Sequence, residues 1–438
     1  MKIIFVENRA LTRLWSEISD QLISAGHEVH WIVQNRLYKP KAGFFHYLNI
    51  RSNTSKKCEN SEKYPFLKKS DRGIYYNGGN DKHYCKHDDR INEILKEVRP
   101  DFIFGECTQY HELLTIYNAK RLSIPYLTPF PSRYPINRFF FYLYDTFEPV
   151  CGSREQIKGD DIEKMIADIS TRSVVLPYMK KKDSHLLLRL GDMFRLFLGW
   201  INGERHITPS PFKRILNNRL HLKNYNLWEA LSKKEIPVNI NNIKKVLYPM
   251  QMQPESNIDV YGQPWNDQSE IIKRIAQSLK KYGYILVVKP NPKSKYELNK
   301  SLISIVKNNS NIIALSHSVS MSSVIGQVDT VLTVTGTILL ECIFSKKRVI
   351  CLGDHLMSKY PGVAQINKPE DILRCLVEDE CNTATNQESK QLLSELYEQS
   401  YNGNIFDPIS NPELMNQENI KALSEAFEGV MKDYFSIK

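Results

Sequence analysis

Val246-Leu-Tyr-Pro-Met-Gln-Met-Gln-Pro-Glu-Ser-Asn257 changes character abruptly along its length. An apolar run ends at Pro249, and amides, a carboxylate and a hydroxyl follow it. Strands buried in parallel sheets are continuous apolar runs, and open α/β sheets bind ligands beyond the carboxyl ends of their strands. We therefore expect a buried strand here whose polar continuation lines a ligand site.

The residues that follow alternate between helix and strand. Residues 269–281 have the apolar periodicity of an amphipathic helix, and residues 284–288 and 330–334 are short apolar runs typical of strands. The second of these runs continues into Thr335-Gly-Thr337 and then into a helix that carries Glu341. This alternation predicts a parallel sheet with its site at the strand ends.

The N-terminal half alternates in the same way. Strands are expected at residues 3–6 and 29–33 around a helix at 11–22, with a further strand at 102–104. No GxGxxG motif follows the first strand, which argues against a dinucleotide there. The predicted fold class is α/β, with two Rossmann-like domains facing a cleft.

Changes in periodicity divide the chain into four expected segments. Residues 1–150 form an N-terminal Rossmann-like domain with an inserted loop at about 39–87, where the pattern fails. A mainly helical linking segment covers 151–240, the C-terminal Rossmann-like domain covers 241–380, and a tail with a last helix covers 381–438.

Composition limits the class of protein. A net charge of +10 suggests an anionic partner, but the basic residues are spread out and no nucleic-acid motif appears, so nucleic acid is not expected. Eight cysteines without a CxxC pair predict reduced thiols in a cytoplasmic protein. We expect no signal peptide and no membrane span, since no stretch approaches the roughly 20 apolar residues that a span needs.

Two local patterns leave alternatives open. His83-x-Cys85-x-His87 resembles a metal site, but no fourth ligand is indicated, and we expect no metal. The apolar stretch 184–200, followed by basic residues such as Arg214 and Arg219, suits either peripheral contact with an anionic inner-membrane surface or a helix buried between domains. We favour the buried helix.

Glu106 is the preferred catalytic carboxylate of the N-terminal half. It follows the strand at 102–104, behind a glycine that lets other groups approach closely. The alternative is an acid in the first turn of a helix. Glu112 lies inside the next helix and is expected to be structural, and Asp145 is the second catalytic candidate.

Arg133 and Arg138 are embedded among aromatic residues. Guanidinium groups held in this way suit bidentate contact with a carboxylate or phosphate. An aromatic core with arginines reaching solvent is the alternative.

Thr335, Gly336 and Thr337 lie where a strand gives way to a helix, so their main-chain amides and hydroxyls are predicted to bind a phosphate. Glu341, one turn further, is expected to accept hydrogen bonds from a ribose, and Lys289 adds positive charge at a neighbouring strand end. Ordinary helix capping by the threonines is the alternative.

These motifs together carry a family resemblance. Leu247 to Asn257, Gly262, Val287-Val-Lys-Pro-Asn-Pro292 and Thr333 to Glu341 resemble the bacterial capsular-polysaccharide synthesis family, which includes transferases of Kdo and related CMP-activated ulosonic acids. The resemblance implies a glycosyltransferase of GT-B type that uses no metal and no cofactor. Its C-terminal domain would bind the CMP-sugar donor and its N-terminal domain a glycan or lipid-linked glycan acceptor of capsule or lipopolysaccharide.

The resemblance also assigns donor-binding residues by position. Gln251 and Glu255 match the family's strand-end amide and acid, and the segment from Thr335 to Glu341 matches its nucleotide-binding segment. Asn291 stands where the family has a histidine that contacts the donor phosphate, and asparagine cannot carry charge. The remaining candidates for the donor site are Ser256 and Pro292.

The implied reaction moves a Kdo-like or nonulosonic acid from CMP to a glycan. Arg133 or Arg138 would pair the sugar carboxylate, and Glu106 or Asp145 would act as general base or as nucleophile, so inversion and retention both stay open. Two alternatives remain. One is a same-fold transferase or epimerase with another nucleotide sugar. The other is a non-catalytic protein that binds a glycan or lipid-linked intermediate during assembly and export.

Overall fold

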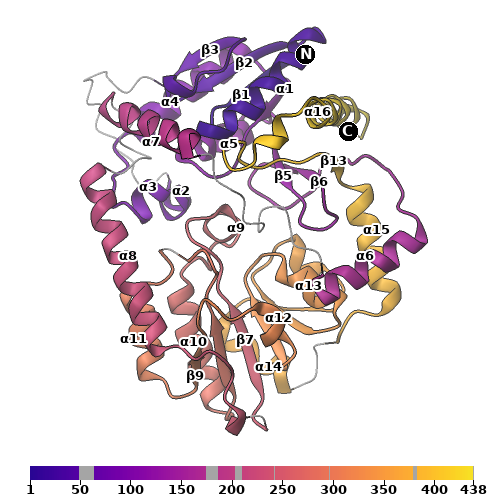
Figure 1. The fold of residues 1–438 in the computed structure, drawn as a ribbon. Coiled ribbons are helices and arrows are strands. Elements are labelled where there is room, and N and C mark those ends of the chain that lie inside the picture. Colours follow the sequence, from indigo (N-terminus) through magenta and orange to yellow (C-terminus); the bar gives the residue numbers. More distant parts are fainter. Residues whose placement is uncertain are drawn as a thin grey trace. The chain divides into compact units, whose positions relative to one another are not determined.

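The computed structural model describes residues 1–48, 64–173, 186–202, 210–240, 242–294, 296–377 and 382–437. The chain folds as two compact units (Figure 1). The N-terminal unit comprises Met1–Ile157, Val175–Lys213 and Glu395–Lys438, and the C-terminal unit comprises Lys158–Val174 and Arg214–Ser394.

The N-terminal unit contains a seven-stranded sheet with the order β13-β6-β5-β4-β1-β2-β3. Strands β1, β2, β3, β4 and β5 run parallel, whereas β6 and β13 are antiparallel to their neighbours. The strands are β1 (Lys2–Val6), β2 (Glu28–Val33), β3 (Phe44–Tyr47), β4 (Phe102–Phe104), β5 (Tyr126–Pro131), β6 (Arg138–Leu143) and β13 (Tyr401–Asn402).

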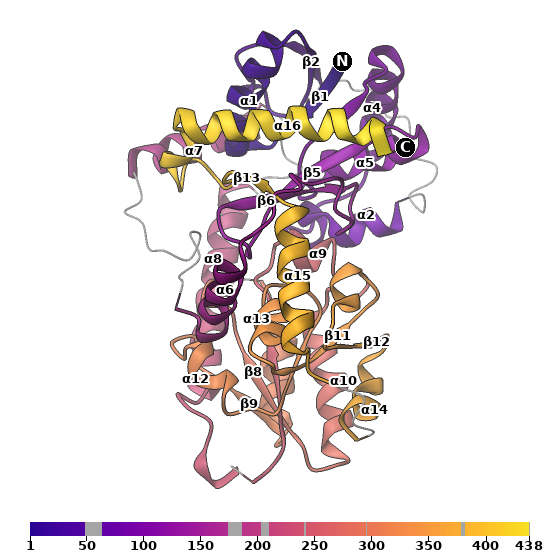
Figure 2. The ribbon, with the colours of Figure 1, turned by 90° about the vertical axis from the view of Figure 1, so that its right-hand side faces the viewer.

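The core of this unit joins the two ends of the described chain. Helix α1 buries Leu14, Trp15 and Ile18 in one apolar cluster that also contains strand residues and the last helix, α16. The Phe427 ring of α16 stacks on Phe5 of β1 at 5.9 Å between centroids, and Figure 2 shows α16 lying beside α1. The helices are α1 (Thr12–Ser24), α2 (Pro65–Ser70), α3 (Arg72–Tyr75), α4 (Tyr84–Val98), α5 (Tyr110–Arg121), α7 (Leu186–Ile201) and α16 (Gln417–Ile437).

The C-terminal unit is built on a six-stranded sheet with the order β12-β11-β10-β7-β8-β9, and every neighbouring pair is parallel. Its strands are β7 (Lys245–Pro249), β8 (Ile285–Lys289), β9 (Ile312–Ala314), β10 (Thr330–Thr333), β11 (Arg348–Leu352) and β12 (Val363–Ile366). Its helices are α6 (Gly159–Thr171), α8 (Pro211–Leu231), α9 (Ser256–Asp259), α10 (Gln268–Lys280), α11 (Lys300–Asn308), α12 (Met321–Ile325), α13 (Ile338–Phe344), α14 (Ile372–Val377) and α15 (Asn386–Glu398).

The fold class expected from the sequence is confirmed: the chain is α/β, with two Rossmann-like units. The expected helix at 269–281 is α10, whose Ile271, Ile272, Ile275 and Leu279 are buried against the sheet because apolar residues at this spacing share one helical face.

Two expectations are wrong. Cys85 is disulfide-bonded, so the eight cysteines are not all reduced thiols. This bond also removes its sulfur from the suspected His83-x-Cys85-x-His87 metal site. Among the described residues, no three His, Cys, Asp or Glu side chains are grouped so as to hold a metal ion.

The second wrong expectation is that the apolar stretch 184–200 forms a buried helix. In α7 the side chains of Leu190, Met193, Phe194, Phe197 and Ile201 are 43–59% exposed, which leaves an apolar face uncovered. None of the helices in the described ranges combines the length and the apolarity that a membrane crossing requires.

Candidate functional site

Polar loops meet at the carboxyl edge of the C-terminal sheet. Gln251, two residues after β7, accepts a hydrogen bond from the Thr335 hydroxyl at 2.8 Å and donates from Nε2 to the Thr335 carbonyl. The Thr335 hydroxyl also donates to the Asn257 carbonyl at 3.0 Å. The strand-end motifs after β7 and β10 therefore form one connected cluster, as parallel strands require.

Gly336 lies against the Gln251 side chain. Its φ is +101°, and a Cβ atom there would lie 3.3 Å from the Gln251 Nε2. Thr337 is the residue before α13, a seven-residue helix, and its side chain does not cap the helix. Thr335 is fully buried and directs its hydroxyl to Gln251 and Asn257, so it binds the neighbouring loop and does not cap the helix.

The Gln251–Thr335 contact offers a test of the cluster. Gln251→Ala leaves the buried Thr335 hydroxyl and carbonyl without these partners, so we expect a loss of about 1–2 kcal/mol in unfolding free energy. Chemical denaturation measures it. Gln277→Ala, an exposed glutamine on α10, is the control and should change stability by less than about 0.5 kcal/mol. Equal effects of the two substitutions would contradict the role given to Gln251.

A second polar network holds the loop after β7. Gln253 donates from Nε2 to Asp259 Oδ1 at 2.7 Å, and Gln268 donates to Gln253 Oε1 at 3.0 Å. All three side chains are buried. Sequence reasoning missed this network, although the spacing of a glutamine and an aspartate around α9 was visible.

The predicted residues Glu255 and Ser256 lie at the start of α9, both half-buried. Glu255 accepts from the Asn257 side chain at 3.2 Å, and its main-chain N–H donates to Asp259 at 2.9 Å. They thus belong to the same edge of the sheet as Gln251.

Lys289, the last residue of β8, brings positive charge to this edge. Its side chain is 2% exposed, and its Nζ donates to the Pro290 carbonyl at 3.2 Å. Burial and, second, the nearby Arg172 guanidinium lower the pKa of Lys289. No acidic partner for Lys289 is found in the described part of the chain. A buried lysine so placed is stabilised by a bound anion.

The sequence predicted that Glu341 accepts hydrogen bonds from a ribose, but its carboxylate is already paired within the protein. This residue, 8% exposed on α13, forms an ion pair with Arg172, the residue that ends α6. The role as a ribose acceptor is therefore not supported by the geometry. Arg172 was missed because it is far from the motif in sequence. The neighbourhood therefore contains two cations, Arg172 and Lys289, and one carboxylate, that of Glu341.

Asn291 and Pro292 follow β8. The Asn291 side-chain oxygen accepts from the Lys293 N–H at 2.9 Å and its carbonyl from the Ser294 N–H at 3.0 Å, so Asn291 closes its own turn. Pro292 is exposed. The turn lies directly beyond Lys289, where the resemblance places a contact with the donor phosphate.

A separate cluster lies at the carboxyl ends of β1 and β4 in the N-terminal unit. The Asn8 side chain donates to Thr108 Oγ1 and to Glu112 Oε1, each at 2.9 Å, and reaches Glu106 Oε2 at 3.5 Å. Glu112 also accepts from the N–H groups of Glu106 and Gln109, at 3.1 and 2.9 Å, and completes a capping box at α5. The structural role expected for Glu112 is confirmed.

Glu106 differs from Glu112 in its surroundings. Burial, and after it the neighbouring Glu112 charge, raise the pKa of Glu106 to about 8. Glu112 has main-chain and side-chain donors around its carboxylate, whereas the contact of Glu106 with Asn8 is long. Glu106 therefore holds a proton near neutral pH and releases it slightly above, which suits a general base or acid.

The other candidates of the N-terminal unit are held by protein partners. Asp145 follows β6 and forms an ion pair with Lys120, which the sequence did not indicate. Arg133 lies over the Phe406 ring at 5.7 Å. Arg138 is 5% exposed and donates to Glu155 and to the Ser153 and Ser400 hydroxyls at 2.6–2.7 Å. The assignment of Arg138 to a sugar carboxylate is corrected, because its nitrogens point into the protein.

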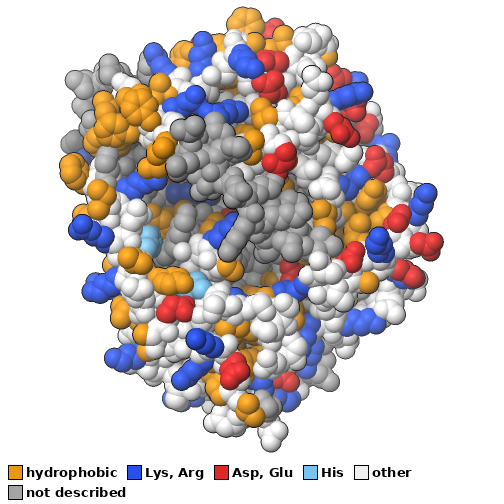
Figure 3. All heavy atoms as spheres, viewed as in Figure 1, with side chains coloured by type: hydrophobic (Ala, Val, Ile, Leu, Met, Phe, Trp, Pro, Cys, Tyr) orange, Lys and Arg blue, Asp and Glu red, His pale blue; other side chains and the backbone are white. Residues whose placement is uncertain are grey.

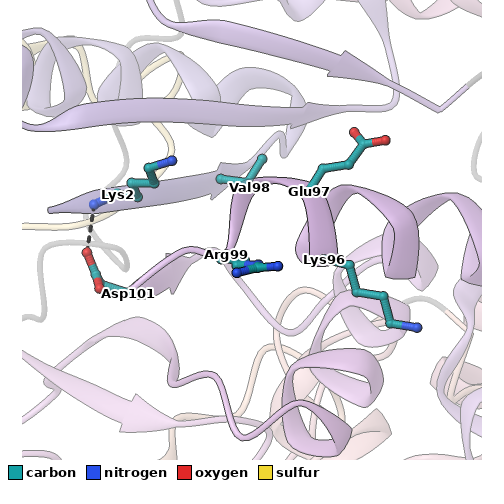
Figure 4. A pocket seen from close by; sticks show the side chains of 6 residues that line it. All are labelled: Lys2, Lys96, Glu97, Val98, Arg99 and Asp101. Carbon is teal, nitrogen blue, oxygen red and sulfur yellow. Dashed lines mark hydrogen bonds between the residues drawn. The ribbon is translucent and has the colours of Figure 1, made fainter.

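The hollow in Figure 4 lies at the edge of the N-terminal sheet opposite to the edge that carries Glu106. Lys2 begins β1 and Asp101 precedes β4, and the Lys2 N–H donates to Asp101 Oδ2 at 2.7 Å. These are the amino ends of parallel strands, whereas Glu106 lies at the carboxyl ends. The hollow is lined by Lys2, Lys96, Glu97, Val98, Arg99 and Asp101.

Comparison with known proteins agrees with the resemblance found in the sequence. Residues 205–391 match the family model of the capsule polysaccharide biosynthesis protein. This range contains every candidate residue of the C-terminal sheet edge except Arg172. Comparison with curated protein sequences gives no match.

Similar solved structures cover nearly the whole chain at low identity. UDP-GlcNAc 2-epimerase from Neisseria meningitidis, bound to UDP-GlcNAc, is 13% identical over 90% of this chain and 98% of its own, with a TM-score of 0.31. MnaA of S. aureus with UDP is 10% identical over 100% and 97%, with a TM-score of 0.30. MurG of Acinetobacter baumannii is 10% identical over 98% and 99%, with a TM-score of 0.28.

Proposed function

We propose that this protein is a metal-independent glycosyltransferase of GT-B type that moves a Kdo-like or nonulosonic acid from a CMP-sugar to a bacterial surface glycan of capsule or lipopolysaccharide. The observation that carries the proposal is the buried, cationic strand edge of the C-terminal unit. Lys289 and Arg172 lie there, within or close to the segment that matches the capsule-synthesis family model.

The donor's phosphate is the group that we assign to this edge. Lys289 is buried, and its lowered pKa is the consequence of burial and of a neighbouring cation. A bound phosphate would supply the missing negative charge and so raise the pKa of Lys289 again. Gln251 and Thr335 hold the two loops together, and Gly336 keeps its main chain free of a side chain that would press on Gln251. The donor site thus comprises Gln251, Glu255, Ser256, Lys289, Asn291, Pro292, Thr335, Gly336 and Thr337.

We assign the acceptor and the base to the N-terminal unit. In the proposed step the acceptor hydroxyl loses its proton to Glu106 and its oxygen bonds to the anomeric carbon of the sugar. The bond between that carbon and the phosphate oxygen breaks, and CMP leaves with the electron pair. A carboxyl group with a pKa of about 8 suits a base better than a nucleophile, which works best when fully ionised. The expected stereochemical course is inversion.

Thermal shift with nucleotides tests donor binding. CMP at a hundred times its Kd should raise the Tm by roughly 5 °C, because ligand bound only to the native state stabilises it. Lys289→Met keeps the buried volume apolar but removes the charge, so it should lose this shift. Lys300→Met, at an exposed lysine that begins α11, is the matched control and should keep it.

The outcomes separate the alternatives. A shift with UDP or GDP but not CMP would assign another nucleotide sugar. No shift with CMP, CDP, UDP or GDP would favour a non-catalytic protein that binds glycans or lipid-linked intermediates, for which the self-closed Asn291 turn is the specific observation. Incubation with CMP-Kdo or a CMP-nonulosonic acid and a glycan acceptor, followed by detection of free CMP and a mass gain, tests transfer itself.

A further inference from the structure

Helix α8 is attached to the C-terminal unit by side chains on one of its faces. The Asn224 side chain donates to the Leu298 carbonyl at 2.8 Å, and the Trp228 indole donates to the Leu315 carbonyl at 2.9 Å. The His221 ring packs edge-on against Tyr296 at 4.3 Å between centroids. These anchors are separated by three and four positions, so they occupy a single face of the helix.

The rest of α8 presents large apolar side chains to solvent. Phe212 is 79% exposed, and Leu216 and Leu222 are each 63% exposed. Ile215 and Leu220 are also exposed. Phe212, Leu216 and Leu220 follow one another at four-residue intervals and form a stripe along the helix. Exposed apolar patches of this kind mark contact surfaces in soluble proteins.

The charged side chains of α8 that precede Glu229 are all basic, and Glu229 itself hydrogen-bonds Ser316 and His317. Residues 210–228 contain Lys213, Arg214, Arg219 and Lys223 and no aspartate or glutamate. Arg214, Arg219 and Lys223 are exposed among the apolar side chains. Figure 3 shows orange and blue side chains interspersed along the left edge, where α8 runs in Figure 1.

We propose that the outer face of α8 (Phe212, Ile215, Leu216, Arg219, Leu220, Leu222 and Lys223) binds the surface of an anionic lipid bilayer. Apolar side chains enter the boundary between headgroups and acyl chains, while lysine and arginine meet the lipid phosphates. The absence of acidic residues over this stretch of sequence favours lipid.

Helix α7 of the N-terminal unit adds a second apolar face of the same kind. Leu190, Met193, Phe194, Phe197 and Ile201 recur at helical spacing and are exposed. Asp192, on the same helix, is taken up by a 2.5 Å hydrogen bond from the Tyr38 hydroxyl. The α7 face is a separate apolar surface of the N-terminal unit, and its contact with lipid is tested on its own.

Co-sedimentation of the full chain with vesicles tests the proposal. We expect binding to phosphatidylcholine vesicles that contain phosphatidylglycerol, little binding to phosphatidylcholine alone, and weaker binding as salt is raised. The double variant Arg219→Gln, Lys223→Gln should bind about tenfold more weakly or worse. Lys280→Gln, Lys300→Gln removes the same charge from exposed positions elsewhere and should bind like the wild type.

Two apolar variants complete the test. One is the double variant Phe212→Ser, Leu216→Ser on α8, and the other is the double variant Phe194→Ser, Phe197→Ser on α7. Each should reduce vesicle binding even at low salt. The circular-dichroism spectrum should stay unchanged, because these residues are exposed. Binding that survives the charge variant, or that falls equally in the control, would overturn the proposal. So would a wild-type dimer that either serine variant converts to a monomer, since a second copy would then cover the face. Vesicle binding is measured without nucleotide, so its failure is distinct from failure of the transferase proposal.

Discussion

Replacing Glu106 with glutamine is expected to lower kcat on the order of a thousandfold, the usual contribution of a general base. The amide keeps the size of the side chain but cannot take the acceptor's proton. The rate of CMP release with saturating CMP-sugar and acceptor measures the effect. Glu93→Gln, at an exposed position on α4, is the matched control and should leave the rate unchanged.

The pH dependence gives this prediction a second readout. Because the pKa of Glu106 is raised to about 8, the wild-type rate should rise as pH approaches and passes 8. The folded state binds the Glu106 proton more tightly than the unfolded chain does. This group therefore lowers the free energy of unfolding as the pH rises from about 4.5 to 8. Glu106→Gln should remove that fall and be the more stable protein at pH 9. A variant that loses activity together with stability at pH 9 would indicate a structural role.

Replacing Arg138 with alanine is expected to cost the N-terminal unit about 3 kcal/mol, or roughly 8 °C in Tm. The guanidinium is buried, donates to Ser400 and Ser153, and stacks on the Tyr397 ring at 4.0 Å. Its removal takes one donor from the Ser400 carbonyl and one from the Ser400 hydroxyl. Denaturation of the full chain measures the loss.

The control for Arg138→Ala is Arg154→Ala. Arg154 is 69% exposed and its nearest acid, Asp433, is 3.9 Å away, so we expect a change below about 0.5 kcal/mol. Arg138→Lys should fall between the two, since lysine keeps the charge but loses the planar fork. If Arg138→Ala retains full stability and instead weakens donor binding, the sugar-carboxylate role is restored.

The repeated strand and helix pattern was sufficient to predict the fold class. Strands such as β8 are buried on both faces, so they appear as uninterrupted apolar runs, and α10 buries the face that its periodicity indicated. The same pattern also predicted that the Gln251 and Thr335 loops lie together, because parallel strands place their carboxyl ends at one edge of the sheet.

The partners of charged side chains were not predictable in the same way. An arginine among aromatics has the same local sequence pattern whether it binds a ligand or is bound internally, as Arg138 is by Ser400. The Arg172–Glu341 ion pair joins elements far apart in the chain. In α7 the periodicity identified an apolar face, but periodicity contains no information on what covers it.

The packing of Phe427 against Phe5 has a consequence for biosynthesis. Strand β1 belongs to a core that is complete only after α16 has been translated, at residues 417–437. The C-terminal unit ends at Ser394 and is fully synthesised earlier. The nascent chain must therefore keep its opening α/β segment unfinished while the intervening unit folds, so the order of folding does not follow the order of translation.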